Sequence, residues 1–368
     1  MSSFVKLGDL THIRTGKLDA NASSENGQYP FFTCSKEPLR IASYSYDCEC
    51  VLVAGNGDLN VKYYDGKFDA YQRTYIIESA DKRKLLVKYL YFFLDIYVEV
   101  LRTQSIGGVI KYIKLGNLTD AHIPLPSIER QAEIIECLEK CNTLIDKRQR
   151  QIALIEQTVK SRFIELFGNY DLTHPQESWA PIKEVGTVVG GATPKTDHDE
   201  YWGGSYRWIT PAELDADSGY IYDSVRKLTK AGVESCSLQE MPVGTVILSS
   251  RAPIGKVAIA GNTFYCNQGF KNIICKEGIT PRYLYTVLLL NVEYLNSLGR
   301  GATFKEISKG IVESIRIPVP SMELQEQFAA FVEQTDKSKY YSSLSFRYCQ
   351  AAANTYRQEW MTCRTSDF

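Results

Sequence analysis

A long repeat constrains this chain more than any other sequence feature. Residues 123–168 begin with Ile-Pro-Leu-Pro-Ser, and residues 317–368 begin with Ile-Pro-Val-Pro-Ser at an offset of 194 positions. The two copies share their prolines, serine, glutamate and glutamine: Pro124, Pro126, Ser127, Glu129 and Gln131 in the first, and Pro318, Pro320, Ser321, Glu323 and Gln325 in the second. Self-similarity over so long a period predicts a tandem duplication of one folding unit.

Both copies carry the signals of a helix start. A proline disfavours helix in the residue before it, so the chain reaches each serine in an extended form. Ser127 and Ser321 can then cap a helix, with a glutamate in each positive first turn. Apolar residues recur every seven positions in the first copy, which is the spacing of a coiled-coil seam: Leu138, Ile145, Ile152, Val159 and Leu166. We predict a helix of roughly 60 Å.

The second copy has a face of small residues instead: Thr335, Ser338, Ser342, Ser345, Cys349, Ala352 and Ala353. Because small residues opposite bulky ones allow close approach, we predict that the two long helices pack on each other. The alternative is two unrelated surface helices. The duplication argues against it, because the repeat extends upstream: from Tyr89 onward the offset stays at 194, pairing Tyr89 with Tyr283, Gly107 with Gly301 and Lys111 with Lys305.

The repeat divides the chain into four predicted parts. Residues 1–122 and 169–316 form two globular domains, and residues 123–168 and 317–368 form the two long helices. Short β-like runs fill the first domain, at residues 29–33, 50–54, 62–64 and 71–77, followed by an amphipathic helix at 85–102. Asp65-Gly66 is a hairpin signal between the third run and the fourth. The fold class is therefore α+β, with two small twisted sheets and their helices joined by two antiparallel coiled-coil helices in a pseudo-twofold repeat.

The second domain follows the same plan with a different sequence. Residues 183–189 correspond to 6–13, residues 246–249 correspond to 51–54, and Asn267-Gln268 correspond to Tyr71-Gln72. The amino-terminal half of each domain diverges, whereas the carboxyl-terminal half is kept alike. Two constant frames that carry different surfaces are typical of a protein that recognises two different targets.

Composition limits the classes of function. The net charge of −1 gives no sign of a nucleic-acid ligand, and the most apolar runs, at 85–101 and 283–298, contain charged or amide side chains that exclude a membrane span. Ten cysteines and four histidines lack the spacing of a zinc site, which favours reduced thiols in a cytoplasmic protein.

No motif for catalysis is present either. The sequence has no glycine-rich nucleotide turn, no phosphate-binding loop and no nucleophile with a histidine and an acid placed by a known pattern. Asp197, Asp199 and Glu200 could hold a metal ion, but such acids beside Lys195 and His198 are more often a solvated loop. We predict no catalytic residue and no metal, so that any covalent chemistry belongs to another chain.

Several segments, in this order, carry a resemblance to a known family. They are YPFFTCS at 29–35, AGNG at 54–57, KFDAYQRTY at 67–75, GGATPKTDHDEYWGGSYRWIT at 190–210 and the two IP-x-PS-x-E-x-Q helix starts. With them the chain resembles the specificity subunits of type I restriction-modification systems. Its serine- and alanine-rich second helix departs from the family pattern.

The resemblance implies a function and a set of partners. The two globular domains would be target-recognition domains, each reading one half of a split, asymmetric target in double-stranded DNA, and the helices would set the spacer and bind two methyltransferase subunits. Restriction subunits would join the same complex. The resemblance further implies N6-adenine methylation by S-adenosylmethionine and cleavage driven by ATP and Mg²⁺, with these cofactors on the partner subunits and none on this chain.

Candidate DNA contacts follow from the chemistry of base recognition. Arginine or lysine pairs with guanine in the major groove, and asparagine or glutamine pairs with adenine. In the first domain the candidates are Lys17, Asn21, Ser35, Asn56, Asn60, Tyr71, Gln72 and Arg73. In the second they are Lys195, Thr196, Tyr201, Trp202, Arg207, Arg251, Lys256, Asn267, Gln268 and Lys271. Lys111 and Lys305, which follow glycines at one repeat position, suit phosphate contacts that fix register without reading bases.

Structural alternatives remain open for these residues. The glycines at 55 and 57 can simply form a turn, Trp202 can fill a core, and Arg73 can make a structural ion pair. For the whole chain the alternative is a coiled-coil scaffold with two protein-binding heads and no DNA binding. The near-zero net charge favours this scaffold, whereas the paired polar and aromatic loops favour DNA.

Overall fold

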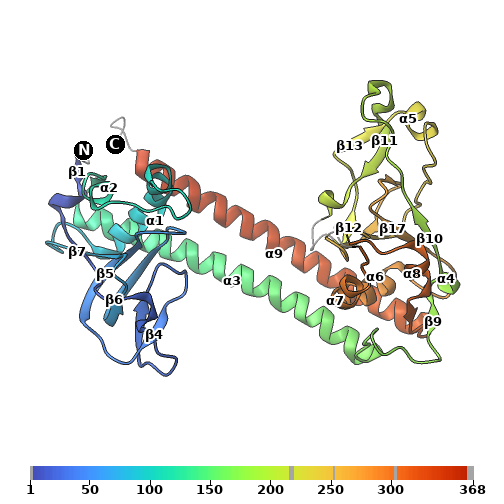
Figure 1. Cartoon of the computed structure of the whole chain (residues 1–368), viewed down its shortest axis with the longest axis horizontal. Coiled ribbons are helices and arrows are strands. Elements are labelled where there is room, and N and C mark those ends of the chain that lie inside the picture. The colour runs from blue at the N-terminus through green and yellow to red at the C-terminus, as the bar shows by residue number, and fades with distance from the viewer. Residues whose placement is uncertain (1–2, 215–218, 252, 302–304, 363–368) are drawn as a thin grey trace. The chain divides into compact units, whose positions relative to one another are not determined.

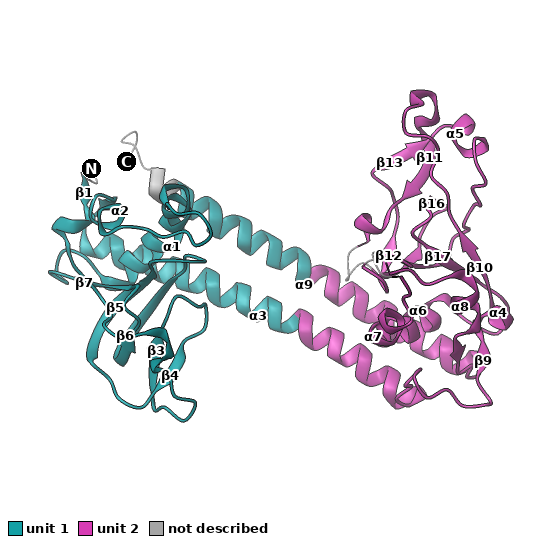
Figure 2. Cartoon of the chain, viewed as in Figure 1, with its two compact units in different colours: residues 1–151, 342–368 teal, residues 152–341 magenta. Residues whose placement is uncertain are grey.

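The computed structural model describes residues 3–214, 219–251, 253–301 and 305–362, with side chains as far as residue 358 (Figure 1). The last six residues of the predicted second helix therefore lie outside the described part. The chain forms two compact units, which Figure 2 shows in two colours. Unit 1 consists of residues 1–151 and 342–368, and unit 2 consists of residues 152–341.

A six-stranded sheet forms the centre of unit 1. Its strand order is β2-β7-β5-β6-β3-β4, and all neighbours are antiparallel except β3 and β6. The strands are β2 Thr11–Thr15, β3 Tyr29–Phe32, β4 Leu39–Ile41, β5 Tyr46–Ala54, β6 Val61–Ala70 and β7 Thr74–Ser79. The side chains of β5 alternate between two cores, Val51 and Val53 in the one that includes α1 Val87–Gln104, and Cys50 and Leu52 in the other.

The predicted hairpin at Asp65-Gly66 is wrong. Strand β6 continues through these residues, and Gly66 pairs with Cys48 of β5 at a φ of 133°. A hairpin would need the segments on either side of the glycine to pair with each other, whereas both pair with β5. Glycine adopts this positive φ without strain, so the strand continues through Gly66 in unbroken register. The turns lie at residues 55–60 and 71–73 instead.

The described part of unit 2 contains two sheets of three or more strands. The larger has the order β10-β17-β14-β15-β12, and the smaller has the order β13-β11-β16. The strands are β10 Gly186–Gly190, β11 Trp202–Ile209, β12 Tyr220–Ile221, β13 Arg226–Leu228, β14 Val246–Leu248, β15 Val257–Ala260, β16 Tyr265–Cys266 and β17 Lys271–Cys275. The helices that complete the unit are α4 Ile182–Val185, α5 Lys230–Glu234, α6 Pro281–Leu290, α7 Val292–Ser297 and α8 Lys309–Ser314.

The two long helices begin where the sequence predicts. Helix α3 is Ile128–Phe167 and α9 is Met322–Thr362, and each follows a short two-stranded pairing: β1 Ser3–Lys6 with β8 His122–Leu125, and β9 Ala180–Pro181 with β18 Arg316–Ile317. Ser127 Oγ accepts a hydrogen bond from the Arg130 N–H at 3.3 Å, as expected of a cap. Hydrogen bonds from its own backbone and from Ser127 hold the pKa of Glu129 below its usual value.

A buried glutamine shows that the duplication is structural. Gln131 accepts from the Leu86 N–H at 2.9 Å and donates to the Lys84 and Pro126 carbonyls at 2.8 and 3.1 Å. Gln325, 194 positions later, accepts from the Thr280 N–H at 2.8 Å and donates to the Gly278 and Pro320 carbonyls at 3.0 and 2.9 Å. All six partners are related by the same offset, which confirms the predicted repeat.

In each unit a part of α3 packs against a part of α9, as predicted. In unit 1, Leu138 of α3 is fully buried in a core that Tyr356 of α9 contacts. In unit 2, Phe163 of α3 meets Phe328 of α9 edge-on, with ring centroids 5.4 Å apart. The beginning of α3 therefore lies against the end of α9, and the helices are antiparallel.

The predicted helix faces are confirmed only in part. Leu138 is buried, but the four later residues of the heptad series are half-buried. On α9, Ser342 and Ala353 are buried, whereas Ser338 and Ala352 are exposed. Two helices in isolation leave more of each seam accessible than a globular core does.

Candidate nucleic-acid interface

Several loops of unit 1 meet at one edge of its sheet. The Gln72 N–H donates to the Leu18 carbonyl at 2.9 Å, and the Gly55 N–H donates to the Arg73 carbonyl at 2.8 Å. The Gly57 N–H donates to the Lys111 carbonyl at 2.9 Å. Residues 16–18, 55–57, 71–73 and 111 are thus tied together, which brings Lys17, Asn56, Gln72, Arg73 and Lys111 into one region.

The side chains of this region are available to a ligand. Lys17, Gln72, Arg73 and Lys111 are exposed, and Asn56 is half-buried. Among the described residues Arg73 has no ion pair, so the structure does not give it the structural pairing considered above. Tyr71 is half-buried beside them, and Asn21 is exposed in the short turn η2 Ala20–Ala22.

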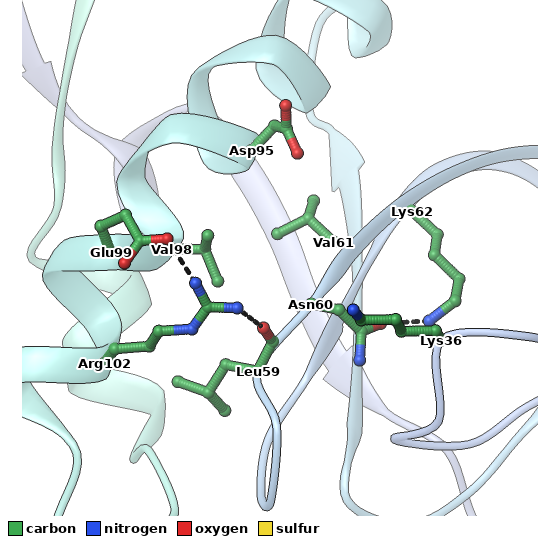
Figure 3. Close-up of a pocket in the computed structure, with 9 residues that line it drawn as sticks. All are labelled: Lys36, Leu59, Asn60, Val61, Lys62, Asp95, Val98, Glu99 and Arg102. Atoms are coloured by element: carbon green, nitrogen blue, oxygen red, sulfur yellow. Dashed lines mark hydrogen bonds and ion pairs between the residues drawn. The ribbon is translucent and has the colours of Figure 1, made fainter. Parts of the chain in front are cut away.

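A second group of unit 1 residues surrounds a cavity of about 320 Å³ next to this edge (Figure 3). Asn60 donates to the Cys34 carbonyl at 2.8 Å, and Lys62 Nζ donates to the Ser35 carbonyl at 2.8 Å and also bonds Asn60 Oδ1. Burial lowers the pKa of Lys62. Arg102 of α1 holds the same turn through the Leu59 carbonyl, at 2.7 Å. Asn60 and Ser35 are therefore fixed by neighbours that the sequence analysis missed.

Unit 2 repeats several backbone hydrogen bonds of the unit 1 edge. The Ser250 N–H donates to the Gly269 carbonyl at 2.8 Å, as Gly55 does to Arg73. The Ile307 N–H donates to the Ser250 carbonyl, and the Ile113 N–H donates to the Gly55 carbonyl, both at 2.9 Å.

The equivalence extends to the strand ends. The Asn267 N–H donates to the Ile209 carbonyl at 3.1 Å, and the Tyr71 N–H donates to the Phe32 carbonyl at 3.0 Å. The predicted correspondence of Asn267 and Gln268 with Tyr71 and Gln72 is thus confirmed. The same bonds make Arg251 the equivalent of Asn56, at the offset of 195 that also relates residues 246–249 to 51–54.

Lys256 occupies the place of Asn60. Its Nζ donates to the Pro211 carbonyl at 3.1 Å and to the Leu214 carbonyl at 2.8 Å. Pro211 lies two residues beyond β11 as Cys34 lies two residues beyond β3, so each side chain joins a turn to the loop beside it. The ammonium of Lys256 therefore serves a loop of its own unit, which the sequence could not indicate.

Arg251 and Lys271 share one carboxylate. Arg251 Nε lies 2.9 Å from Glu306 Oε2, and Lys271 Nζ lies 3.1 Å from Glu306 Oε1. Burial opposes the charge on Glu306, but the hydrogen bonds from Lys271 and Arg251 outweigh it, and the pKa of Glu306 is lowered. The backbone of Glu306 forms antiparallel β-bridges with Arg251 and with Arg300. In the sequence Glu306 directly follows Lys305, the predicted phosphate contact.

The aromatic candidates of unit 2 belong to a small cluster around β11. The guanidinium carbon of Arg226 lies 3.4 Å from the centre of the Trp202 ring, and Trp202 Nε1 donates to the Lys195 carbonyl at 3.2 Å. Trp202 meets Trp208 edge-on at 5.1 Å. Trp202 therefore packs against a small apolar cluster, as the alternative of a core residue predicts, although its ring stays half-buried.

The remaining unit 2 candidates lie on loops around this cluster. Lys195, Thr196 and Gln268 are exposed, and Gln268 accepts a hydrogen bond from Thr193 at 2.6 Å. Arg207 Nε contacts Asp223 at 3.2 Å, and Tyr201 stacks on His198 at 5.0 Å. The side chains of Gln268, Arg207 and Tyr201 are thus held by contacts within unit 2.

The metal alternative concerns Asp197, Asp199 and Glu200, which lie within the described residues. No group of three histidine, cysteine or acidic side chains there could hold a metal ion, and Glu200 instead accepts from His198 at 2.8 Å. The nine cysteines with described positions are free thiols. No described helix is long and apolar enough to cross a membrane.

Two duplicated edges, each with its own set of polar side chains, define a protein that presents two different recognition surfaces. The chain matches the family described as "Type I restriction modification DNA specificity domain" over residues 2–157 and 177–340. It is 40% identical to the EcoDI specificity subunit of Escherichia coli, a match that covers 90% of this chain and 80% of that protein. The chain therefore belongs to the family of type I restriction-modification DNA specificity subunits, which are not the catalytic subunits of these systems.

Other relatives agree. The type I restriction enzyme MjaIX specificity subunit of Methanocaldococcus jannaschii is 42% identical over 48% of this chain, a match that spans 42% of that protein. The crystal structure of the type I S subunit from M. genitalium has a TM-score of 0.68 at 14% identity, covering 99% of this chain and 97% of that one. This likeness shows that the two chains share a fold.

Proposed function

We propose that each unit reads one half of a bipartite, asymmetric target in double-stranded DNA. The edge of unit 1 around Asn56, Gln72 and Arg73 reads one half, and the edge of unit 2 around Arg251 and Gln268 reads the other. Lys111 and Lys305 contact phosphates at equivalent places and fix the register. Helices α3 and α9 set the length of the unread spacer.

The observation that carries this proposal is that the edges of the two units share backbone hydrogen bonds but differ in their side chains. The hydrogen bonds that position residues 55, 73 and 113 recur at 250, 269 and 307. At equivalent positions, however, unit 2 has Arg251 in place of Asn56 and Gly269 in place of Arg73. Amide side chains pair with adenine and guanidinium side chains with guanine. One frame that holds different donors and acceptors suits two half-sites of different sequence.

The covalent steps belong to partner subunits in this proposal. Two methyltransferase subunits dock along α3 and α9 and bind S-adenosylmethionine, and restriction subunits bind ATP and Mg²⁺. A solved structure that shares this fold, with a TM-score of 0.52, comes from work titled "Structural basis underlying complex assembly and conformational transition of the type I R-M system". The complex would work in the cytoplasm, where free thiols such as those of this chain persist.

Replacing Arg73 by alanine tests the assignment of unit 1 to one half-site. If its exposed guanidinium pairs with a guanine, the Arg73→Ala complex loses about 1–3 kcal/mol of discrimination at that position and relaxes one half-site only. The measurement is single-molecule sequencing of methylated DNA from cells that co-express the variant chain with its methyltransferase. Omitting the methyltransferase should abolish methylation, since this chain is not expected to catalyse it.

Two outcomes would contradict this prediction. An equal loss of affinity for specific and random DNA would reassign Arg73 to the phosphate backbone. A complex that forms with the methyltransferase but shows no DNA shift in a gel would instead favour the protein-binding scaffold.

Lengthening the helices tests their role as a spacer ruler. Four residues inserted near Gln149 of α3, with four more in α9 where unit 2 gives way to unit 1 after Tyr341, add about 6 Å of helix. We expect the methylated motif to keep both half-sites and gain about two base pairs of spacer. The same four residues exchanged by substitution at exposed positions serve as the control. An unchanged spacer in a fully methylated genome would refute the ruler.

A further inference from the structure

The contact of Glu306 with Arg251 leaves the end of the guanidinium free of that carboxylate. Glu306 Oε2 accepts a hydrogen bond from Arg251 Nε at 2.9 Å, and Glu306 Oε1 accepts one from Lys271 Nζ. The Arg251 side chain remains 46% exposed, whereas that of Lys271 is 14% exposed. Arginine recognises a planar acceptor pair through a rigid fork of N–H groups, so a carboxylate at Nε fixes the direction of the fork.

The Glu306 contacts are not part of the duplicated frame. Strand pairing places Lys271 opposite Gly190 in unit 2 and Tyr75 opposite Thr15 in unit 1, so that Tyr75 is the equivalent of Lys271. Tyr112 is the equivalent of Glu306, because Tyr112 bridges Asn56 and Ile106 as Glu306 bridges Arg251 and Arg300. Three charged residues in unit 2 therefore stand where unit 1 has three uncharged ones, on the same backbone.

A stabilising role alone does not account for this exchange. Unit 1 builds the same turn with Asn56 and Tyr112 and no carboxylate, so the backbone bonds hold the turn without the charges. An acid at a DNA-binding edge also repels phosphate, which is a cost unless it serves the neighbouring cations. Arg251, Lys271, Arg300 and Lys305 all lie beside Glu306 in the fold or the sequence.

We propose that Glu306 is a positioning residue for base recognition, which orients Arg251 to read one guanine in the half-site of unit 2. The proposal rests on the function proposed above. Lys271 completes the arrangement by neutralising the second oxygen of Glu306, so that the carboxylate holds Arg251 without presenting a bare negative charge to DNA. Glu306 itself contacts no base.

The test compares variants that each remove one charged side chain, in the complete complex. Cells co-express the methyltransferase with the wild-type chain, Glu306→Gln, Arg251→Ala, or the matched control Glu277→Gln, an exposed acid of the same unit. Single-molecule sequencing then reports the methylated motif. We expect Arg251→Ala to lose roughly 5- to 150-fold in preference for guanine at one position. Glu306→Gln should weaken the preference at the same position, and Glu277→Gln should leave the motif unchanged.

Each other outcome decides against the proposal. If Arg251→Ala relaxes one position and Glu306→Gln leaves that position intact, Glu306 does not orient Arg251. If Glu306→Gln raises the affinity for all DNA equally without changing the motif, the carboxylate only repels phosphate. A wild-type complex without any split motif would refute the proposed function instead, and so distinguishes the two failures.

A further variant covers the case in which Glu306→Gln does not fold. Arg251→Lys keeps the positive charge and the contact with Glu306 but lacks the planar fork. We expect it to lose the guanine preference at the same position as Arg251→Ala. If Arg251→Lys retains the wild-type motif, Arg251 contributes charge and not base recognition, and the proposal is overturned.

Discussion

Replacing Phe328 by alanine is expected to lower the free energy of unfolding of this protein by about 3–5 kcal/mol. The Phe328 ring is fully buried and lies at the centre of an aromatic cluster, 5.4 Å from Phe163 and 5.6 Å from Phe167, measured between ring centroids. Its removal leaves a cavity between the segments of α3 and α9 in unit 2. Denaturant unfolding followed by circular dichroism measures the loss.

Phe331, one turn further along α9, provides the matched control. It is only half-buried and lies beneath Arg162, whose guanidinium carbon is 5.9 Å from the ring centre. Phe331→Ala should cost clearly less, because much of the space it vacates is open to water. Equal losses for Phe328→Ala and Phe331→Ala would show that the cluster around Phe163 does not hold the helices together.

Replacing either buried glutamine by leucine is expected to cost roughly 3 kcal/mol or more, because three backbone groups lose their partner each time. Gln131 and Gln325 are both fully buried, and both join the start of a long helix to the loop before α1 or α6. Leucine has a similar volume but no polar atom, so it leaves one N–H and two carbonyls without this partner. The two variants should lose similar amounts.

Gln334→Leu is the control for this pair. Gln334 is exposed on α9, and an exposed substitution of this kind usually changes stability by less than about 0.5 kcal/mol. Thermal and denaturant unfolding of the three variants measure the differences. If one of the two buried glutamines tolerated leucine, the equivalence of the two helix starts would not extend to their energetics.

The sequence predicts the parts of this fold that depend on local rules. Prolines and serines mark the helix starts. A constant offset of 194 identifies the residues of 283–325 that are equivalent to those of 89–131. Asp65-Gly66 shows where such rules fail. A hairpin signal reports what two residues can do, whereas the partner strand decides what they do, and β5 is long enough to pair on both sides of the glycine.

The candidate interface shows a second kind of limit. Residue type and loop composition identified Arg251, Lys256 and Lys271, but not where their charged groups point. Lys256 bonds two carbonyls of a neighbouring loop, and Lys271 bonds Glu306. These partners are distant in sequence and are not related by the repeat offset. Glu306 was detectable in principle, since it follows Lys305, but its unit 1 equivalent is a tyrosine.

The composition of unit 1 from two separate stretches affects how the chain folds during synthesis. Residues 342–368 belong to unit 1, and Arg357 there lies 3.4 Å from Asn142 and 3.6 Å from Asp95. A ribosome therefore finishes all of unit 2 before it makes the segment that completes unit 1. Until then the core of unit 1 lacks its contact with Tyr356, and we expect the nascent chain to offer this apolar surface to chaperones and proteases for that interval.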